Sequence, residues 1–315
     1  MESILTTVLP VFGLIILGFA FARFKVVDQA TARGLTQFVF TLAIPALLFR
    51  TVALTKPQEA TPFGLWIAFF GGLALTWIIT GLFARKFASL SASGGAAASM
   101  AAGFGNIALL GTPLALSHFG ESAAVPVGLV LSIHAPLLWF AATLHREIAR
   151  HSGNISFVRL GRELFISLAG NAIVLALLAA ALWRLTGLGL HPVADRMLSM
   201  LSDASVPTAL FALGLSLSAY SLRGQWSGMT MLIALKMVLM PILVFLALRY
   251  VVSVPPLWAK VALLLAAMPT GANAFLFAHR NEESVAAVSA AIALGTGLAA
   301  ITASLLLYLM DTGAI

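Results

Sequence analysis

The 315-residue sequence contains no cysteine, which excludes disulfide bonds and thiol chemistry. Charged residues are scarce, at 9% of the chain, whereas hydrophobic residues make up 61%. A soluble domain of this size lacks the interior to hide so much apolar surface. Lysines and arginines stand singly at the ends of apolar runs and not in clusters with aromatic residues, so the net charge of +7 does not indicate a nucleic-acid partner.

Motifs for catalysis are missing as well. An intramembrane aspartyl protease needs two membrane carboxylates, and only Asp203 lies well inside an apolar run. The segment GLSLS at 214–218 does not match a Gly-x-Ser-x-Gly nucleophile motif. We find no metal-ligand cluster and no nucleotide-binding loop. The sequence therefore predicts neither an enzyme nor a bound cofactor or metal.

Apolar runs of about 18 residues or more recur from end to end, and each is long enough to cross a bilayer as a helix. The first run lacks the basic leader and the cleavage site of a signal peptide, so we interpret it as a span. We predict an all-α polytopic membrane protein with ten transmembrane helices. Their ranges are 6–23, 35–53, 64–84, 95–117, 124–144, 165–186, 197–219, 228–250, 257–278 and 285–309.

A polar connection at 145–163 divides the ten helices into two halves of five. Because five is odd, related halves must cross the membrane in opposite orientations. The second span of each half carries a similar segment, AIPALLF at 43–49 and SVPTALF at 205–211. We predict helix breaks at Pro45 and Pro207, and the alternative is that these prolines only kink their helices. The predicted units are a first inverted repeat (1–145), a cytoplasmic linker (146–164) and a second inverted repeat (165–315).

The distribution of basic residues predicts the orientation of the chain. With both termini outside, the inner loops carry eleven cations and the outer loops and helix ends carry six. The inner set is Arg23, Lys25, Arg33, Arg85, Lys86, Arg146, Arg150, Arg159, Arg162, Arg223 and Arg280, and the outer set is Arg50, Lys56, Arg184, Arg196, Arg249 and Lys260. We therefore predict a multi-pass protein of the plasma membrane, a bacterial inner membrane, with both termini extracytoplasmic.

The fourth and ninth spans are interrupted near their middle. The fourth contains GFGNIALLGTP at 103–113, and the ninth contains MPTGANAF at 268–275. A broken helix frees backbone N–H and C=O groups, each of which costs several kcal/mol in lipid unless protein or water satisfies it. Two broken helices that cross at the bilayer centre would satisfy each other and would point the positive N-terminal ends of half-helices into a cavity. We therefore predict an anion-binding site where the two spans cross.

The predicted substrate-binding residues come from these two segments and from two other spans. They are Asn106, Gly111, Thr112, Pro113, Pro269, Thr270, Gly271 and Asn273, together with Lys236 and His134. The asparagines would hydrogen bond the anion, backbone amides near 111–113 and 269–271 would surround it, and Lys236 would balance its charge. Structural alternatives are glycines that pack helices, asparagines that join helices, and a lysine that snorkels or caps the end of a broken helix.

Two titratable residues are candidates for proton coupling. His134 lies near mid-bilayer, where a histidine is more often a satisfied interior residue than a ligand. Asp203 lies nearer the outer face, as judged from the helix rise per residue, and is an outer gate, a proton carrier or a helix-start residue. The fifth span, 124–144, contains no acid, which disfavours a sodium/proton antiporter.

Over its whole length the chain resembles the auxin efflux carrier family, which includes plant PIN-type carriers and bacterial organic-acid carriers such as malonate transporters. Four segments carry the resemblance in order: FVFTLAIPALLFR, NIALLGTPL, LSDASVPTALFALGLSL and AAMPTGANAFLFA. The third segment contributes Gly214 in addition to Asp203 and Pro207. In the tenth span, Gly295 and Thr296 stand where bacterial members often have Ser-Thr.

The resemblance implies two inverted five-helix repeats whose fourth and ninth helices cross, as in bile-acid symporters and sodium/proton antiporters. It implies a scaffold domain, chiefly spans 1, 2, 6 and 7, and a transport domain of spans 3–5 and 8–10. It also implies a homodimer and elevator-type alternating access. We therefore expect a secondary active transporter of a small organic anion, a mono- or dicarboxylate, in a lipid bilayer. The alternatives are a sodium- or proton-coupled symporter of the bile-acid type and a non-transporting receptor or structural dimer.

Overall fold

The structure, a computed structural model, describes every residue except 1, 55–60, 88–91, 150–155, 222–225 and 315. Within these described residues, extended pairing is limited to one isolated antiparallel bridge between Gly105 and Thr270, and the remainder is helix, turn and loop. The predicted loop cations Lys56, Arg150 and Arg223 lie outside the described residues. The all-α prediction is confirmed.

Helices occupy the five ranges predicted for the first half. They are α1 (Glu2–Arg23); α2 (Gln29–Phe38), the π-helical turn η1 (Val39–Ala43) and α3 (Ile44–Leu54); α4 (Pro62–Phe87); α5 (Ala92–Gly103), the π-helical turn η2 (Ile107–Gly111) and α6 (Thr112–Phe119); and the 3₁₀ turn η3 (Glu121–Ala123) with α7 (Ala124–Ala149).

The second half has helices in its five predicted ranges as well. They are α8 (Phe157–Ala169) and α9 (Ala172–Leu185); α10 (Pro192–Asp203) and α11 (Ser205–Leu217); α12 (Trp226–Ala234), the π-helical turn η4 (Leu235–Leu239) and α13 (Met240–Tyr250); α14 (Pro256–Ala266) and α15 (Ala272–Asn281); and α16 (Val285–Asp311).

Seven helices in the described part of the chain are long and apolar enough to cross a membrane, and an eighth results if α8 and α9, which meet at 61°, form one span. The seven are 6–23, 29–54, 62–84, 121–149, 192–217, 226–250 and 285–311. The segments Ile107–Phe119 and Pro256–Ala266 are apolar but shorter, because the fourth and ninth predicted spans are interrupted. The protein is thus a multi-pass membrane protein with seven to eight apolar membrane-spanning helices.

Three prolines distort helices without ending them. Pro45, Pro113 and Pro241 are each the second residue after a π-helical turn. Proline lacks an N–H group and its ring clashes with the carbonyl four residues earlier. The wider π-helical turn, with bonds between residues five apart, relieves this clash.

The prediction that Pro45 and Pro207 break their helices is therefore wrong, and the alternative, a distortion within a continuous span, agrees with the structure. Residues 29–54 form one continuous helical span around Pro45. Pro207 lies in the first turn of α11. Residues in the first turn of a helix donate no hydrogen bond within it, so the N–H group that proline lacks is not needed there. The neighbouring irregularity is at Ala204, and residues 192–217 still count as one span.

The described part of the predicted linker, 146–164, is largely helical. Helix α7 extends to Ala149, and α8 begins at Phe157 after Ser156, whose hydroxyl accepts a hydrogen bond from the Arg159 amide. The charged residues of this segment predicted a loop. Ser156 caps the start of α8 and the residues of α8 are amphipathic, and both features stabilise a helix there. The bend before α9 is stabilised by the Asn171 side chain, which caps that helix.

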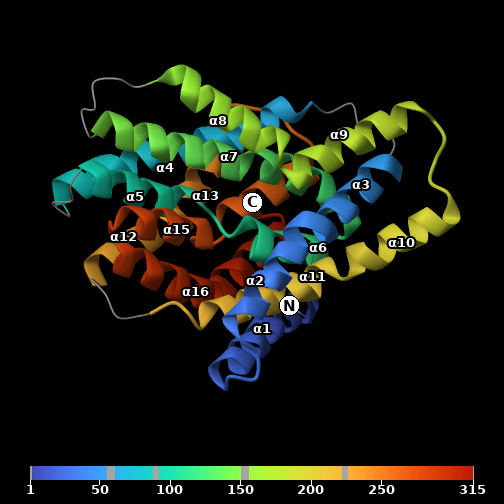
Figure 1. Ribbon diagram of the computed structural model, residues 1–315, viewed down its shortest axis with the longest axis horizontal. Coiled ribbons are helices and arrows are strands. Elements are labelled where there is room, and N and C mark those ends of the chain that lie inside the picture. The colour runs from blue at the N-terminus through green and yellow to red at the C-terminus, as the bar shows by residue number, and fades with distance from the viewer. Residues whose placement is uncertain (1, 55–60, 88–91, 150–155, 222–225, 315) are drawn as a thin grey trace.

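The helices pack in two groups. In the first group, α1 and α2 pack against α11, and α3 packs against α9 and α10. In the second group, α4 packs against α5 and α13, α5 against α7, and α12 against α16. Figure 1 shows most of the first group at the right of the view and most of the second group at the left.

Gly214 explains part of the first group's tight packing. A Cβ atom at Gly214 would lie 2.1 Å from the Ile15 carbonyl oxygen, and one at Gly18 would lie 2.3 Å from the Phe211 carbonyl oxygen. Helices α1 and α11 therefore approach backbone to backbone, as small residues permit in membrane helices.

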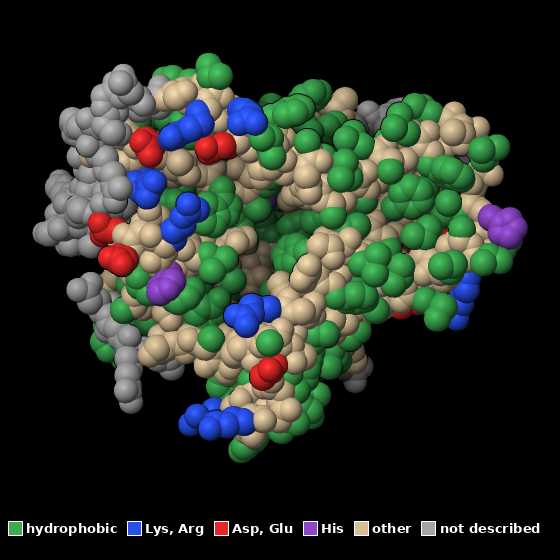
Figure 2. Space-filling model, viewed as in Figure 1, with side chains coloured by type: hydrophobic (Ala, Val, Ile, Leu, Met, Phe, Trp, Pro, Cys, Tyr) green, Lys and Arg blue, Asp and Glu red, His purple; other side chains and the backbone are tan. Residues whose placement is uncertain are grey.

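The surface agrees with a membrane location. In Figure 2, charged side chains gather toward the left end of the molecule, and a broad, mainly hydrophobic region lies beside them. The centre of this face is hollowed, in the part of the view where Figure 1 draws the interrupted helices and α6.

Candidate functional site

The two interrupted helices contact each other at their interruptions. Helix α5 ends at Gly103 and η2 starts at Ile107, whereas α14 ends at Ala266 and α15 starts at Ala272. The Asn106 amide donates a 2.7 Å hydrogen bond to the Pro269 carbonyl, and the Gly271 amide donates one of 2.8 Å to the Phe104 carbonyl. We call the paired segments 104–106 and 267–271 the crossover. Each interruption satisfies backbone groups of the other.

The close approach of the two segments favours glycine where they touch. A Cβ atom on Gly271 would lie 3.0 Å from the Gly105 carbonyl oxygen and 3.2 Å from the Asn106 amide nitrogen. A Cβ atom on Gly105 would lie 3.3 Å from Nζ of Lys236. Gly111 has a different role, because a Cβ atom there would meet the Leu265 side chain at 2.8 Å, so its small size serves packing.

Side chains cap the C-terminal ends of α5 and α14, the two half-helices that lead into the crossover. Lys236, fully buried in η4, donates a 2.6 Å hydrogen bond from Nζ to the Ala266 carbonyl at the end of α14. Thr270 donates a 2.9 Å hydrogen bond from its hydroxyl to the Ala101 carbonyl near the end of α5. A cation at a helix C-terminus interacts favourably with the helix dipole. The capping alternative for Lys236 is therefore confirmed, and two of its three N–H groups remain for other partners.

The N-terminal ends of the opposite half-helices are uncapped. Neither Asn106, before η2, nor Gly271, before α15, provides a side-chain cap. The backbone amides at 107–109 and 272–273 donate no hydrogen bond to any described residue. Residues 107–109 are also at most 7% exposed. At the start of α15, Ala272 is exposed and Asn273 is half-buried. Helix N-termini without protein acceptors are places for water or a ligand, and their dipoles favour an anion.

Two asparagines flank these uncapped ends. The Asn106 side chain is buried and forms no hydrogen bond with the described residues. Asn273, in the first turn of α15, is half-buried, and within the described chain its side-chain amide is likewise without a partner. Both amides can donate hydrogen bonds to a ligand.

Several other predicted site residues use their hydrogen bonds within the protein. The Gly111 amide donates to the Asn106 carbonyl at 3.0 Å, and both the amide and the hydroxyl of Thr112 donate to the Ile107 carbonyl. Pro113 has no N–H group. The prediction of free amides at 111–113 is therefore wrong: the π-helical turn closes on them, and the free amides lie about one turn earlier, at 107–109.

The second interrupted segment differs from its prediction in a similar way. The amide of Gly271 and the hydroxyl of Thr270 are both engaged across the crossover, and Pro269 supplies its carbonyl as an acceptor. These residues hold the crossover together. The groups left for a ligand are those of Asn273 and the first amides of α15.

His134 lies beside the crossover. Its ring, on α7, packs edge to face on the Phe104 ring with centroids 4.7 Å apart. The side chain is buried, and its Nε2 atom has no hydrogen-bond partner among the described residues. Phe104 was not predicted from the sequence, although its place between two glycines of the interrupted segment is a signal that could have identified it.

Asp203 is not part of this site. It is exposed at the end of α10 and contributes to the electrostatic environment of Arg50. Arg50 itself forms ion pairs with Asp195 at 2.7 Å and with Glu121 at 3.4 Å. The structure thus brings together the crossover, Lys236 and His134, and leaves Asp203 in a separate ionic cluster.

Comparison with known proteins identifies the family. Residues 3–307 match the sequence profile of a family described as "Membrane transport protein". A Rhizobium meliloti protein named "Putative malonate transporter" is 31% identical, over 100% of this chain and 98% of that protein. "Auxin efflux carrier component 8" of Arabidopsis thaliana is 24% identical over 98% and 97% of the two chains. An "Uncharacterized transporter" of Methanothermobacter thermautotrophicus is 27% identical over 94% and 95%.

These matches cover nearly the whole chain. The relatives are named as transporters, and the family is a transport family and not a family of enzymes. The chain therefore belongs to the membrane transport protein family that contains the auxin efflux carriers, and it is a multi-pass membrane transporter.

Proposed function

We propose that this transporter carries a small organic anion, a mono- or dicarboxylate, whose carboxylate binds at the crossover. The observation that supports this best is the pair of uncapped helix N-termini, at 107–109 and 272–273, beside two asparagine side chains without protein partners. A carboxylate accepts hydrogen bonds and donates none, so it matches a site made of donors. The relative named as a malonate transporter agrees with this substrate class.

Each group has a distinct role in the proposed site. Asn106 and Asn273 donate hydrogen bonds to the carboxylate oxygens, and the free amides of η2 and α15 complete their coordination. Lys236 supplies positive charge next to the crossover, where its ammonium donates to the Ala266 carbonyl. A buried lysine is costly in a membrane, and an anion nearby lowers that cost.

We also propose ten spans arranged as two inverted repeats, 1–145 and 165–315. The interruption of the fourth span in each half supports this. The two packing groups support a scaffold formed chiefly by spans 1, 2, 6 and 7 and a transport domain of spans 3–5 and 8–10. Movement of the transport domain past the scaffold would give elevator-type alternating access in a homodimer, in the plasma membrane with both termini outside.

A second candidate is proton-coupled transport. It is favoured by His134, whose Nε2 atom is buried without a partner beside the crossover. A histidine in this position can take up a proton in one state of the cycle and release it in the other. Imposed pH and sodium gradients distinguish proton coupling, sodium coupling and uncoupled exchange by which gradient accelerates uptake.

The experiment that tests the proposed function is carboxylate counterflow in proteoliposomes. Wild-type protein should exchange radiolabelled malonate or a related small carboxylate. Asn106→Ala should reduce exchange by a factor of about ten to a hundred, the equivalent of a lost hydrogen bond to a charged group. Gln37→Ala removes an exposed amide on α2 and serves as the matched control. Undiminished exchange by Asn106→Ala would contradict the site, and no exchange of any carboxylate by wild type would favour a receptor.

A further inference from the structure

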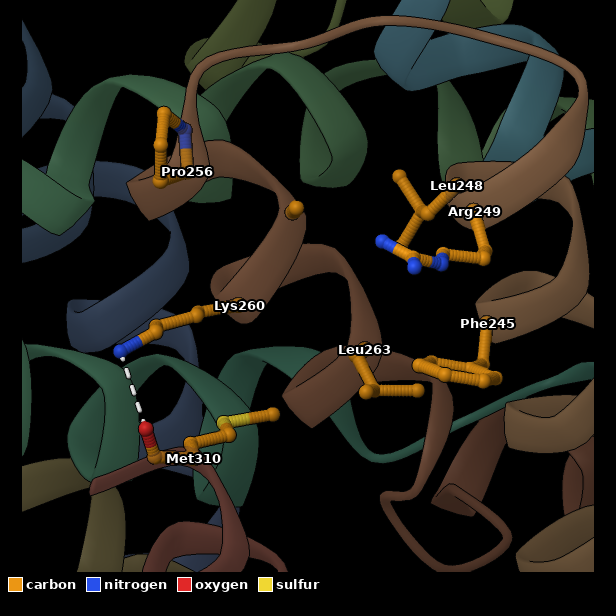
Figure 3. A pocket seen from close by; sticks show the side chains of 8 residues that line it. Phe245, Leu248, Arg249, Pro256, Lys260, Leu263 and Met310 are labelled. Atoms are coloured by element: carbon orange, nitrogen blue, oxygen red, sulfur yellow. Dashed lines mark hydrogen bonds between the residues drawn. The ribbon is translucent and has the colours of Figure 1, made fainter. Parts of the chain in front are cut away.

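A cavity lies apart from the crossover, between α13, α14 and α16 (Figure 3). Its volume is about 210 Å³. Its walls are mainly apolar and include Phe245, Leu248, Leu263 and the side chain of Met310. Such walls match a hydrocarbon chain and offer little to a small hydrophilic solute.

Two basic residues, Arg249 and Lys260, line this cavity. Figure 3 shows the Arg249 side chain extending from α13 toward α14. Its guanidinium forms no ion pair or hydrogen bond with the described residues. The ammonium of Lys260 donates a 3.1 Å hydrogen bond to the Met310 carbonyl, near the C-terminal end of α16. Both side chains thus bring positive charge to the cavity, and Arg249 is available to a ligand.

Acidic residues do not neutralise this charge. None of the described residues that line the cavity is acidic. The carboxylate nearest in sequence, Asp311, pairs with His118 at 3.1 Å. The cavity therefore combines apolar walls with uncompensated positive charge.

The cavity lies at the ends of the helices that line it. Arg249 lies in the last turn of α13, and Pro256 and Lys260 lie in the first turns of α14. Basic side chains at the ends of membrane helices lie at the level of the lipid headgroups, where they attract anionic lipids.

We propose that this cavity binds an anionic glycerophospholipid, with its phosphate on Arg249 and an acyl chain against Phe245, Leu248 and Leu263. Lys260 adds long-range attraction while it caps α16. Because α14 packs against both α13 and α16, the bound lipid joins the ends of three helices. This inference does not depend on which solute the protein carries.

Native mass spectrometry of the detergent-purified full chain tests the proposal. The probes are a phosphatidylglycerol and a phosphatidylcholine with the same acyl chains. Wild type should bind the anionic lipid more tightly, and Arg249→Gln should weaken that binding about fivefold, as expected for one cation near a membrane surface. Arg196→Gln removes an exposed cation from α10 and should leave binding unchanged. Ala259→Phe, which fills the cavity and keeps both cations, should also weaken binding.

Three outcomes would overturn the proposal. Equal binding of the two lipids would show that charge does not matter, and equal weakening by Arg249→Gln and Arg196→Gln would show that the cavity does not matter. Competition by excess inorganic phosphate, with no effect of Ala259→Phe, would identify a site for free anions and not for lipid.

Discussion

Replacing Gly271 by alanine tests the contact between the two interrupted helices. The added methyl group would lie 3.0 Å from the Gly105 carbonyl oxygen, 3.0 Å from Cδ1 of Phe104 and 3.2 Å from the Asn106 amide nitrogen. Two of these three atoms belong to the backbone, which cannot move aside as a flexible side chain can. The segments 104–106 and 267–271 would therefore have to separate.

The size of the effect follows from two contributions. Overpacking of a tight contact costs about 1–3 kcal/mol. Separation of the segments also weakens the bonds from Asn106 to Pro269 and from Gly271 to Phe104, each worth about 1 kcal/mol. We expect Gly271→Ala to lower the free energy of unfolding by about 2–4 kcal/mol and to abolish counterflow.

The assay is thermal unfolding of the detergent-purified protein, followed by tryptophan fluorescence. Gly297→Ala is the matched control, because Gly297 lies within α16 and a Cβ atom there would meet no atom within 4 Å. Alanine is favoured over glycine in a helix by up to about 1 kcal/mol, so the control should be neutral or slightly stabilised. Equal unfolding midpoints for the two variants would refute a close crossover contact.

Three further predictions concern other parts of the molecule. Lys236→Met should abolish transport with little change in the unfolding midpoint. Loss of the cap on the Ala266 carbonyl costs about 1–3 kcal/mol, and removal of a buried charge restores a similar amount. Transport by purified Lys236→Met would contradict the proposed role of Lys236 in binding the anion. Gly214→Ala should lower the unfolding midpoint through the contact with α1, whereas Gly13→Ala, with open space around it, should not, and equal midpoints would contradict the packing. His134→Gln should retain counterflow and lose any acceleration of uptake by a pH gradient; acceleration equal to that of wild type would exclude His134 as the proton carrier.

Much of the fold could be predicted because membrane helices are specified locally. Apolar length alone predicted where helices lie, and the interruptions at 103–113 and 268–275 were visible as glycine, asparagine and proline in apolar runs. The four motifs identified the family, which the comparisons confirm. The contact between the two interruptions could be expected since lipid leaves free backbone groups no other partner.

The details that could not be predicted depend on packing across helices. The sequence left open whether Lys236 caps a helix or balances an anion, because only the fold places it beside the Ala266 carbonyl. The free amides were expected at 111–113, but a π-helical turn before Pro113 uses them and leaves those at 107–109 free. A proline also follows the π-helical turn η4, at Pro241 in the segment KMVLMP. A proline inside an apolar helical run is therefore a signal that could have predicted η4.

The most direct test of a carboxylate site at the crossover is an experimental structure of the protein with a transported carboxylate bound. The ligand would be the small carboxylate that gives the fastest counterflow, with a heavy-atom analogue to mark its position. We predict its carboxylate oxygens within hydrogen-bonding distance of the Asn106 and Asn273 side chains and of the amides at 107–109 or 272–273. A carboxylate bound elsewhere, with the crossover amides contacting only water or protein, would contradict the account.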